Sequence, residues 1–310
     1  MWPAVGLAFF LVVGWLVADY VKLIDWAGVG RALSAYSPLT LVAAAALAAL
    51  SHLTYASYDL LGRAYAGHHL APSRVLGVAF ISYAFNLNLG SLVGGFGLRL
   101  RLYHRLGLRA AQIGHVIALS LVTNWTGWLL LAGAAFALGQ APLPDSFVLS
   151  AIGMQALGIA MVATALGYIV LCFVSRRRKW LWRNHAFRLP SGRMALAQVA
   201  VSSFNWLLIG TIVWLLMPRG LGYGVVVATQ LAAAMLAVPT HIPGGLGVIE
   251  AIFVAALGGG TVQSELIAAV IAALLAYRAL YYLVPLALAA ALYCALEASR
   301  SRRRSAESLV

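Results

Sequence analysis

Charged side chains are scarce in this chain. Only 9% of its 310 residues are Asp, Glu, Lys or Arg, and just eight are acidic. Soluble domains carry about 25% charged residues, so the composition excludes an ordinary soluble protein. Eight carboxylates also leave few pairs for acid–base catalysis. The sequence contains no His-Glu-x-x-His, no Gly-x-Ser-x-Gly and no P-loop lysine motif, and we therefore expect that the chain is not an enzyme.

Cysteine is equally scarce. The two cysteines, Cys172 and Cys294, both lie in apolar stretches. This usage excludes a disulfide framework and a cysteine-based metal site. We expect no metal and no cofactor.

Apolar residues dominate instead, at 63% of the chain, and the mean hydropathy is +0.92. Apolar runs of membrane-spanning length recur from end to end. They predict an all-α integral membrane protein with about eight transmembrane helices. We expect one polytopic domain over 1–298 and a short basic tail over 299–310. The predicted spans are 3–19, 38–61, 74–93, 115–139, 148–174, 194–217, 222–238 and 264–297. The last is too long for one crossing and contains Pro285, so it is either two helices or one kinked helix.

The net charge of +13 comes from basic clusters beside apolar spans, with seven basic residues in 176–193 and four in 300–304. Such clusters anchor a protein on the cytoplasmic side, where anionic lipids attract them. We therefore expect phospholipids rather than nucleic acid as partners, with other membrane proteins or a homo-oligomer left open. The loop 139–147 has no basic residue and belongs outside, which places the C-terminus in the cytoplasm.

Glycine and proline cluster at two places in the apolar sequence. Broken helix at membrane depth is tolerated only where it lines a cavity or packs inside protein. Paired interruptions in the two halves of a chain indicate a transporter's central site. Three glycines recur at an offset of 150 residues, which leaves open either an inverted repeat or a chance match. We predict two re-entrant segments, a turn over Gly90–Gly97 and a broken helix over Pro239–Gly260. Their hinges are predicted at Gly94, Gly95, Gly97, Pro239, Pro243, Gly244, Gly245 and Gly247.

Three ionisable residues close to these hinges are candidates for binding a lipid headgroup. Arg99 follows the first hinge and would hold a phosphate, or it is an ordinary cytoplasmic anchor. Glu250 follows the second and either meets a cationic group, takes up a proton, or forms a structural salt bridge with Arg278. Arg278 either faces the bundle interior or extends to an interface. His52, Tyr55 and Asp59 lie at spacings of three and four, which stacks them on one helical face. Asp59 is interpreted as a solvated loop carboxylate, with membership of a polar relay as the alternative. Candidate cavity-lining residues are Asn86, Asn88, Tyr277 and Tyr281.

Three stretches carry a resemblance to a known family. They are Gly-Gly-Phe-Gly-Leu-Arg-Leu-Arg-Leu-Tyr at 94–103, Pro-Gly-Gly-Leu-Gly-Val-Ile-Glu-Ala at 243–251, and Tyr-Arg-Ala-Leu-Tyr-Tyr-Leu-Val-Pro-Leu at 277–286. Their order and spacing resemble the lysylphosphatidylglycerol synthase transmembrane-region family, whose best-known member is the bacterial multiple peptide resistance factor. The resemblance extends over nearly the whole chain.

That resemblance implies a flippase that moves an anionic or aminoacylated phospholipid, such as phosphatidylglycerol, across the bacterial inner membrane. The synthase domain of the full-length resistance factor has no counterpart after residue 296, so the resemblance implies no synthase activity. Two alternatives stay open. One is a non-transporting partner subunit of an envelope lipid complex. The other is an intramembrane lipid-modifying enzyme with Glu250 or Asp59 as its base.

Overall fold

The computed structural model describes residues 26–141, 150–176, 179–182, 185–240, 243–257 and 264–307. The regular secondary structure of these residues is helical apart from one antiparallel pair of short strands, β1 (Lys179–Trp182) and β2 (His185–Arg188). The predicted all-α membrane architecture is therefore confirmed in outline. Besides the elements introduced below, the helices are α2 (Trp26–Ser34), α3 (Pro38–Ala56), α4 (Tyr58–Ala66), α7 (Ala110–Ala137), α8 (Ala151–Val174) and α9 (Gly192–Leu216).

Five helical stretches in the described part are long and apolar enough to cross a membrane: Pro38–Ala66, Ala110–Ala137, Ala151–Val174, Gly192–Leu216 and Glu265–Ala298. Five of the eight predicted spans correspond to them. The predicted span 3–19 lies outside the described residues. The remaining two, 74–93 and 222–238, correspond to helices that are each followed by a reversal of the chain.

The first reversal follows α5 (Pro72–Leu89). Gly90 adopts a φ of 84°, and the chain then returns along α5 as the π-helical turn η1 (Ser91–Leu98) and α6 (Arg99–Arg105). The break therefore lies at Gly90, the first residue of the predicted turn over Gly90–Gly97, and not at the predicted hinge glycines that follow. Gly94 lies inside the returning helix, where a Cβ atom would be 2.0 Å from the backbone nitrogen of Asn86. Its glycine is needed for close approach rather than for a bend.

The second reversal follows α10 (Tyr223–Ala237), and the returning arm is α11 (Val248–Leu257). Here the predicted glycines do form the break. Gly244, Gly245 and Gly247 have φ values of 63°, 60° and 79°, a left-handed region that glycine enters without steric cost. Pro239 and Pro243 belong to the two short 3₁₀ turns of this connection, η2 (Val238–Thr240) and η3 (Pro243–Gly245).

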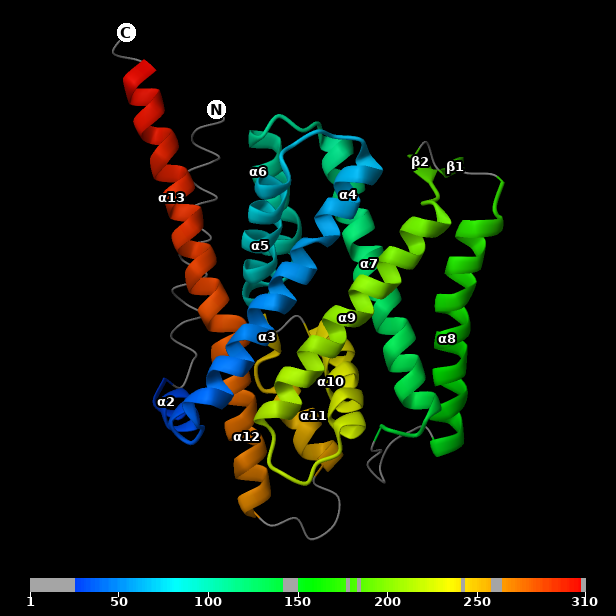
Figure 1. Cartoon of the computed structure of the whole chain (residues 1–310), viewed down its shortest axis with the longest axis vertical. Helices are drawn as coiled ribbons and strands as arrows, with labels where there is room; N and C mark the ends of the chain where they lie inside the picture. The colour runs from blue at the N-terminus through cyan, green and yellow to red at the C-terminus, as the bar shows by residue number, and fades with distance from the viewer. Residues whose placement is uncertain are drawn as a thin grey trace.

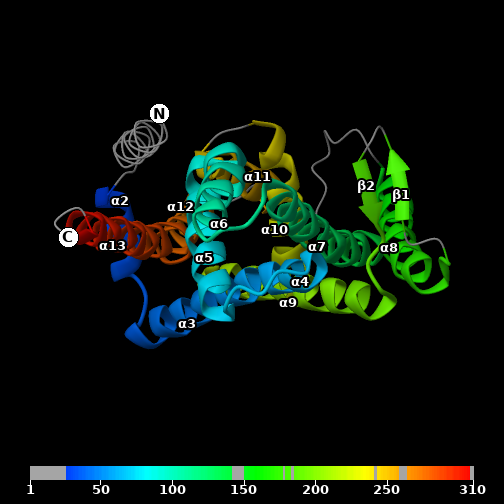
Figure 2. The same cartoon turned by 90° about the horizontal axis from the view of Figure 1, so that it is seen from above.

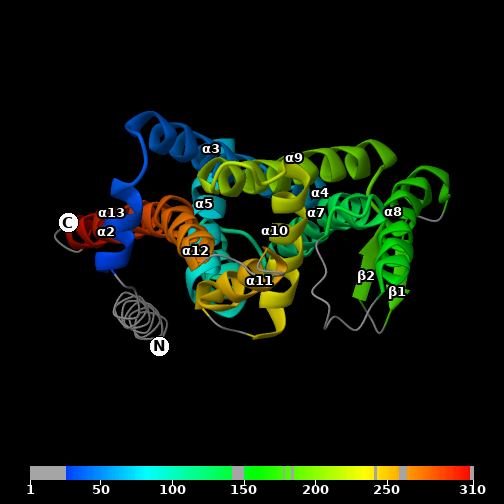
Figure 3. The same ribbon diagram turned by 90° about the horizontal axis from the view of Figure 1, so that it is seen from below.

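The two helical hairpins lie toward opposite ends of the bundle. Figure 1 shows α5 and α6 in the upper half and α10 and α11 in the lower half. A long crossing precedes and follows each hairpin, α3–α4 and α7 for the first, α9 and the C-terminal helix for the second. Viewed along the long axis, both hairpins lie in the middle of the molecule, with α8 and the β-hairpin at one side (Figures 2 and 3). The turns of the hairpins consequently meet inside the bundle.

The last span is one continuous helix rather than two. It consists of α12 (Ser264–Arg278), the π-helical turn η4 (Ala279–Leu283) and α13 (Val284–Glu307). The π turn ends two residues before Pro285. Since proline removes a backbone donor and clashes with the preceding turn, this widened turn accommodates it without breaking the helix. The turn also carries Tyr281 and Tyr282, both buried.

Small residues bring the central helices together. A Cβ on Gly127 of α7 would lie 2.3 Å from the Ser202 hydroxyl of α9, and one on Gly158 of α8 would lie 2.4 Å from the backbone of Ala137. Close backbone approach of this kind is how membrane helices associate, because lipid gives them no hydrophobic driving force. α7 is thereby fixed against α8 and α9 and forms a rigid wall beside the hairpins.

Candidate functional site

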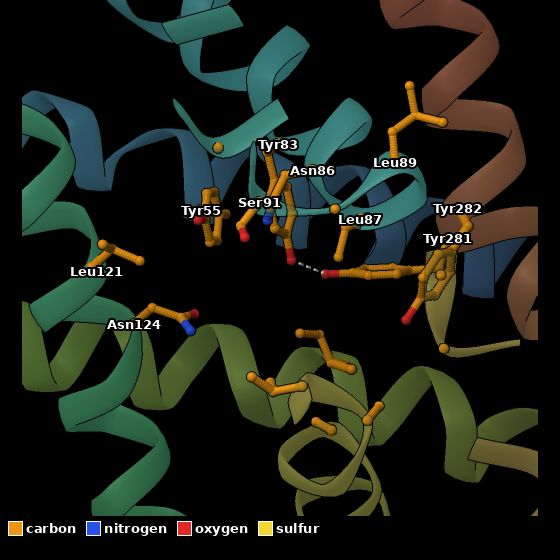
Figure 4. Close-up of a pocket in the computed structure, with 18 of the residues that line it drawn as sticks. Tyr55, Tyr83, Asn86, Leu87, Leu89, Ser91, Leu121, Asn124, Tyr281 and Tyr282 are labelled. Atoms are coloured by element: carbon orange, nitrogen blue, oxygen red, sulfur yellow. Dashed lines mark hydrogen bonds between the residues drawn. The ribbon is translucent and has the colours of Figure 1, made fainter. Parts of the chain in front are cut away.

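A cavity of about 600 Å³ lies where the two hairpin turns meet. The first hairpin contributes Gly90, Ser91 and Gly95 to its wall, and the second contributes Gly244 and Gly245. α7, α9 and the C-terminal helix close the remaining sides. Figure 4 shows labelled side chains from α3, α5, α7 and η4 around this space. The cavity therefore depends on both halves of the chain.

Tyrosines form one wall of the cavity. The hydroxyls of Tyr83 and Tyr281 are 2.9 Å apart (Figure 4), and Tyr281 also lies 3.0 Å from the Ser51 hydroxyl. Ser51 donates in turn to Asn205 at 2.7 Å. The rings of Tyr55 and Tyr83 stack with their centroids 3.5 Å apart. A hydrogen-bonded network of this kind holds polar groups at fixed positions within an apolar bundle.

Arg99 is the one charged residue among those that line the described cavity. Its side chain is only 3% exposed, and its Nη2 lies 3.1 Å from Oδ1 of Asp59. Its guanidinium sits 5.8 Å from the centre of the Tyr55 ring. Its Nε has no hydrogen-bond partner among the described residues. The cavity thus presents a buried cation that has donor capacity to spare.

Asp59 overturns the interpretation made from the sequence. It is fully buried rather than solvated, and it accepts a hydrogen bond of 2.8 Å from the Tyr103 hydroxyl. The sequence did place His52, Tyr55 and Asp59 on one helical face, and all three are buried. Their spacing was the signal for a polar inward face. The partner of Asp59 lies 40 residues later, on an element whose position depends on the first hairpin.

Neutral polar side chains complete the lining. Asn86, Ser91, Asn124 and Gln230 all line the cavity, and the Oε1 atom of Gln230 is buried with no hydrogen-bond partner among the described residues. Asn88, predicted to line it, does not. Its side chain is buried and donates to the backbone carbonyls of Ala84 and Tyr282, at 2.8 and 3.3 Å. Among the described residues, no group of three or more His, Cys, Asp or Glu is placed to hold a metal ion.

Arg278 and Glu250 lie behind the cavity wall rather than on it. Nη2 of Arg278 is 2.8 Å from Oε1 and 3.1 Å from Oε2 of Glu250, and Nε is 3.1 Å from Oε1. The same guanidinium donates to the carbonyls of Gly244 and Gly245, at 2.6 and 3.3 Å. It also lies 5.5 Å from the Tyr282 ring centre. Arg278 therefore fixes the left-handed turn of the second hairpin against the C-terminal helix.

Removing this guanidinium is expected to destabilise the protein strongly. Arg278→Met leaves a carboxylate and two turn carbonyls without their donor, and breaking such a pair costs about 3–5 kcal/mol. Glu250→Gln should cost less, because the amide oxygen still accepts from Arg278. The free energy of unfolding in mixed detergent micelles measures both. Glu265→Gln, an exposed acid at the start of α12, is the matched control. Equal stability of Arg278→Met and wild type would contradict this role.

The sequence is similar to known proteins over nearly its whole length. The family model described as the lysylphosphatidylglycerol synthase transmembrane region matches residues 4–289. The chain is 41% identical over 297 residues to inner membrane protein YbhN of Escherichia coli (strain K12), covering 96% of this chain and 92% of that protein. It is 26% identical over 307 residues to the uncharacterized protein slr0712 of Synechocystis, covering 97% and 92%. This protein is therefore a member of the lysylphosphatidylglycerol synthase transmembrane-region family.

Proposed function

We propose that this protein translocates an anionic or aminoacylated phospholipid between the leaflets of the bacterial inner membrane. The amphiphilic lining of the cavity carries the proposal. Its depth holds the Arg99 guanidinium and tyrosine hydroxyls, while four large apolar lining residues are exposed at its edge. Leu92 is 81% exposed, and the others are Phe96, Leu121 and Val238. Such an edge suits acyl chains that remain in the membrane while the headgroup enters.

Arg99 is the group that would hold the phosphate. A guanidinium binds phosphate through two parallel donors, and its charge is permanent. Asn86, Ser91 and Gln230 would offer hydrogen bonds to the glycerol or aminoacyl part of the headgroup. A charged side chain at the centre of a bilayer costs roughly 2.5–3.5 kcal/mol on insertion scales, and a charged headgroup likewise needs compensation there. Every ~1.4 kcal/mol of the headgroup's barrier that the site offsets would accelerate translocation about tenfold.

The opposed hairpins would supply alternating access. We interpret them as re-entrant segments of an inverted repeat, which enter the bilayer from opposite sides and meet at its midplane. Arg63, Arg74, Arg105 and Arg109 all lie in or beside the loops that flank the first hairpin. By the positive-inside rule, this end faces the cytoplasm, and so does the C-terminus. Movement of either hairpin would open the cavity to the leaflet on its own side.

A leaflet-accessibility assay in proteoliposomes tests the proposal. Labelled phosphatidylglycerol, its lysyl form and a zwitterionic phospholipid are placed in one leaflet, and their appearance in the other is followed over time. We expect faster exchange of at least one lipid than in empty liposomes. Equal exchange in both preparations, for every lipid tried, would favour a non-transporting partner subunit. A chemically altered lipid would instead indicate an intramembrane enzyme.

A further inference from the structure

Asp59 and Arg99 form a buried ion pair, and Arg99 also lines the cavity. Both side chains are almost completely buried, at 0% and 3% exposure, and their charges cancel. An isolated charge in such surroundings costs several kcal/mol, so the pair is stable only as a neutral unit. Anything that changes the charge on one partner must be compensated at the other.

An anion that enters the cavity meets the same guanidinium that Asp59 holds. Arg99 lines the cavity and its Nε has no partner among the described residues, so it offers donors to a phosphate. A phosphodiester carries one negative charge. With Asp59 ionised, the loaded site would hold two anions and one cation at membrane depth. Two anions that compete for one buried cation cannot both stay ionised without a large penalty.

On the side of Asp59 away from the cavity lie groups through which a proton can pass. The hydroxyl of Tyr103 donates to Asp59 at 2.8 Å, and the Ser120 hydroxyl of α7 also faces this carboxylate. The ring centre of His68 lies 6.2 Å from that of Tyr103. Neither ring nitrogen of this buried histidine has a hydrogen-bond partner among the described residues. His68 belongs to the loop between α4 and α5.

His68 is suited to pass a proton rather than to hold one. Burial, reinforced by the positive charge of Arg63, lowers the pKa of His68 below its ordinary value. The ring is therefore neutral near pH 7, with one nitrogen able to accept a proton and the other able to donate one. Among the groups facing Asp59, Arg99 keeps its charge and Tyr103 keeps its proton. Asp59 is left as the group that changes.

We infer that Asp59 takes up one proton from solvent when a phosphate anion binds to Arg99, and releases it when the anion leaves. This inference rests on the proposed binding of a lipid phosphate in the cavity. The proton bonds to a carboxylate oxygen of Asp59, and Arg99 turns its donors to the phosphate. The loaded cavity then carries no net charge. Each binding event then takes up one proton and each release returns it, so the affinity for an anionic lipid depends on pH.

The direct test counts protons during binding by the full-length protein in nanodiscs made of zwitterionic lipid. Phosphatidylglycerol is added in weakly buffered solution with a pH indicator, and binding is measured in parallel. Glycerophosphoglycerol, the same phosphodiester without acyl chains, distinguishes a headgroup site from a lipid site. We expect uptake of about one proton per anion bound, and an affinity that falls up to tenfold per unit of rising pH, as linkage requires.

The Asp59→Asn variant tests whether Asp59 is the group that takes up the proton, and Glu297→Gln is the control. The neutral amide side chain would mimic the protonated acid, so the Asp59→Asn variant should bind the anion with no proton uptake and little pH dependence. Glu297 also pairs with arginines, namely Arg101 and Arg105, but it does not line the cavity. Glu297→Gln should behave as wild type. Uptake that persists in Asp59→Asn, or is lost in Glu297→Gln, would refute the assignment.

Infrared difference spectra supply a second readout that does not depend on Asp59→Asn folding. Anion binding to wild type should produce a carbonyl band of a protonated carboxylic acid. In Tyr103→Phe this band should move to higher frequency, because the hydroxyl that bonds Asp59 is gone. Absence of the band, or a band that does not move, overturns the inference. Anion binding and lipid translocation without proton uptake would overturn it while leaving the proposed function intact. No binding of either phosphodiester would overturn both.

Discussion

Arg99→Met is expected to abolish lipid translocation and to lower the free energy of unfolding by about 3–5 kcal/mol. Two losses combine in this variant. The cavity loses the one charged residue of its described lining, and Asp59 is left buried without a cation. Translocation is measured in proteoliposomes, and unfolding is measured in mixed detergent micelles.

Arg99→Met combined with Asp59→Asn separates these two effects. Removing both members of a buried ion pair is often neutral for stability, whereas removing one is not. The double variant should therefore regain most of the lost stability and still fail to move phosphatidylglycerol. Wild-type rates in a stable double variant would show that the pair is structural and that no phosphate binds to Arg99.

Gly94→Ala should prevent the first hairpin from closing. A Cβ there would lie 2.0 Å from the backbone nitrogen and 2.4 Å from the Cα of Asn86. These are backbone atoms of the opposing arm, and they cannot move aside as a flexible side chain would. Overpacking in a tight core lowers the free energy of unfolding by about 1–3 kcal/mol. Because this clash is with backbone atoms, we expect a loss at or above the upper end of that range. We expect poorly folded protein and no translocation.

Gly77→Ala is the matched control for this substitution, because Gly77 lies in the other arm of the same hairpin, on α5, and a Cβ there meets nothing within 4 Å. It should keep wild-type stability or gain slightly, since alanine is favoured over glycine in helices by about 1 kcal/mol. A Gly94→Ala protein as stable as Gly77→Ala would mean that the two arms do not pack as closely as the structure places them.

The second hairpin was predictable from sequence to a degree that the first was not. Three glycines after Pro243 indicated a broken helix, and Gly244, Gly245 and Gly247 all adopt positive φ. In the first hairpin Gly94 and Gly95 lie against Asn86 of α5, and Gly90 makes the turn. The sequence alone does not distinguish a glycine needed for close backbone approach from one needed for a left-handed turn. The two differ only in whether the backbone of another segment lies against them, as that of Asn86 lies against Gly94.

The candidate site was predicted in its chemistry better than in its geometry. The sequence identified Arg99, Glu250 and Arg278 as candidate site charges, with anchoring or interfacial positions as alternatives for the two arginines, and it offered pairing of Glu250 with Arg278, which the structure shows. It did not identify Asp59 as the partner of Arg99. That pairing joins a residue of α4 to one of α6, and no local pattern encodes a contact between residues 40 positions apart. Tyr55 and Tyr83 were missed as lining residues for the same reason.

If phospholipid headgroups pass through the cavity between the hairpins, a reversible block of that cavity should stop lipid exchange. Ser91 lines the cavity and is exposed. A bulky thiol reagent that forms a disulfide is applied to the Ser91→Cys variant in proteoliposomes. Wild type, whose Cys294 is also exposed, receives the same treatment as the control. We expect exchange of labelled phosphatidylglycerol in the modified variant to fall to the rate of empty liposomes. Reduction of the disulfide should restore it, and exchange by wild type should not change. Unchanged exchange in the fully modified variant would contradict passage of the headgroup through the cavity.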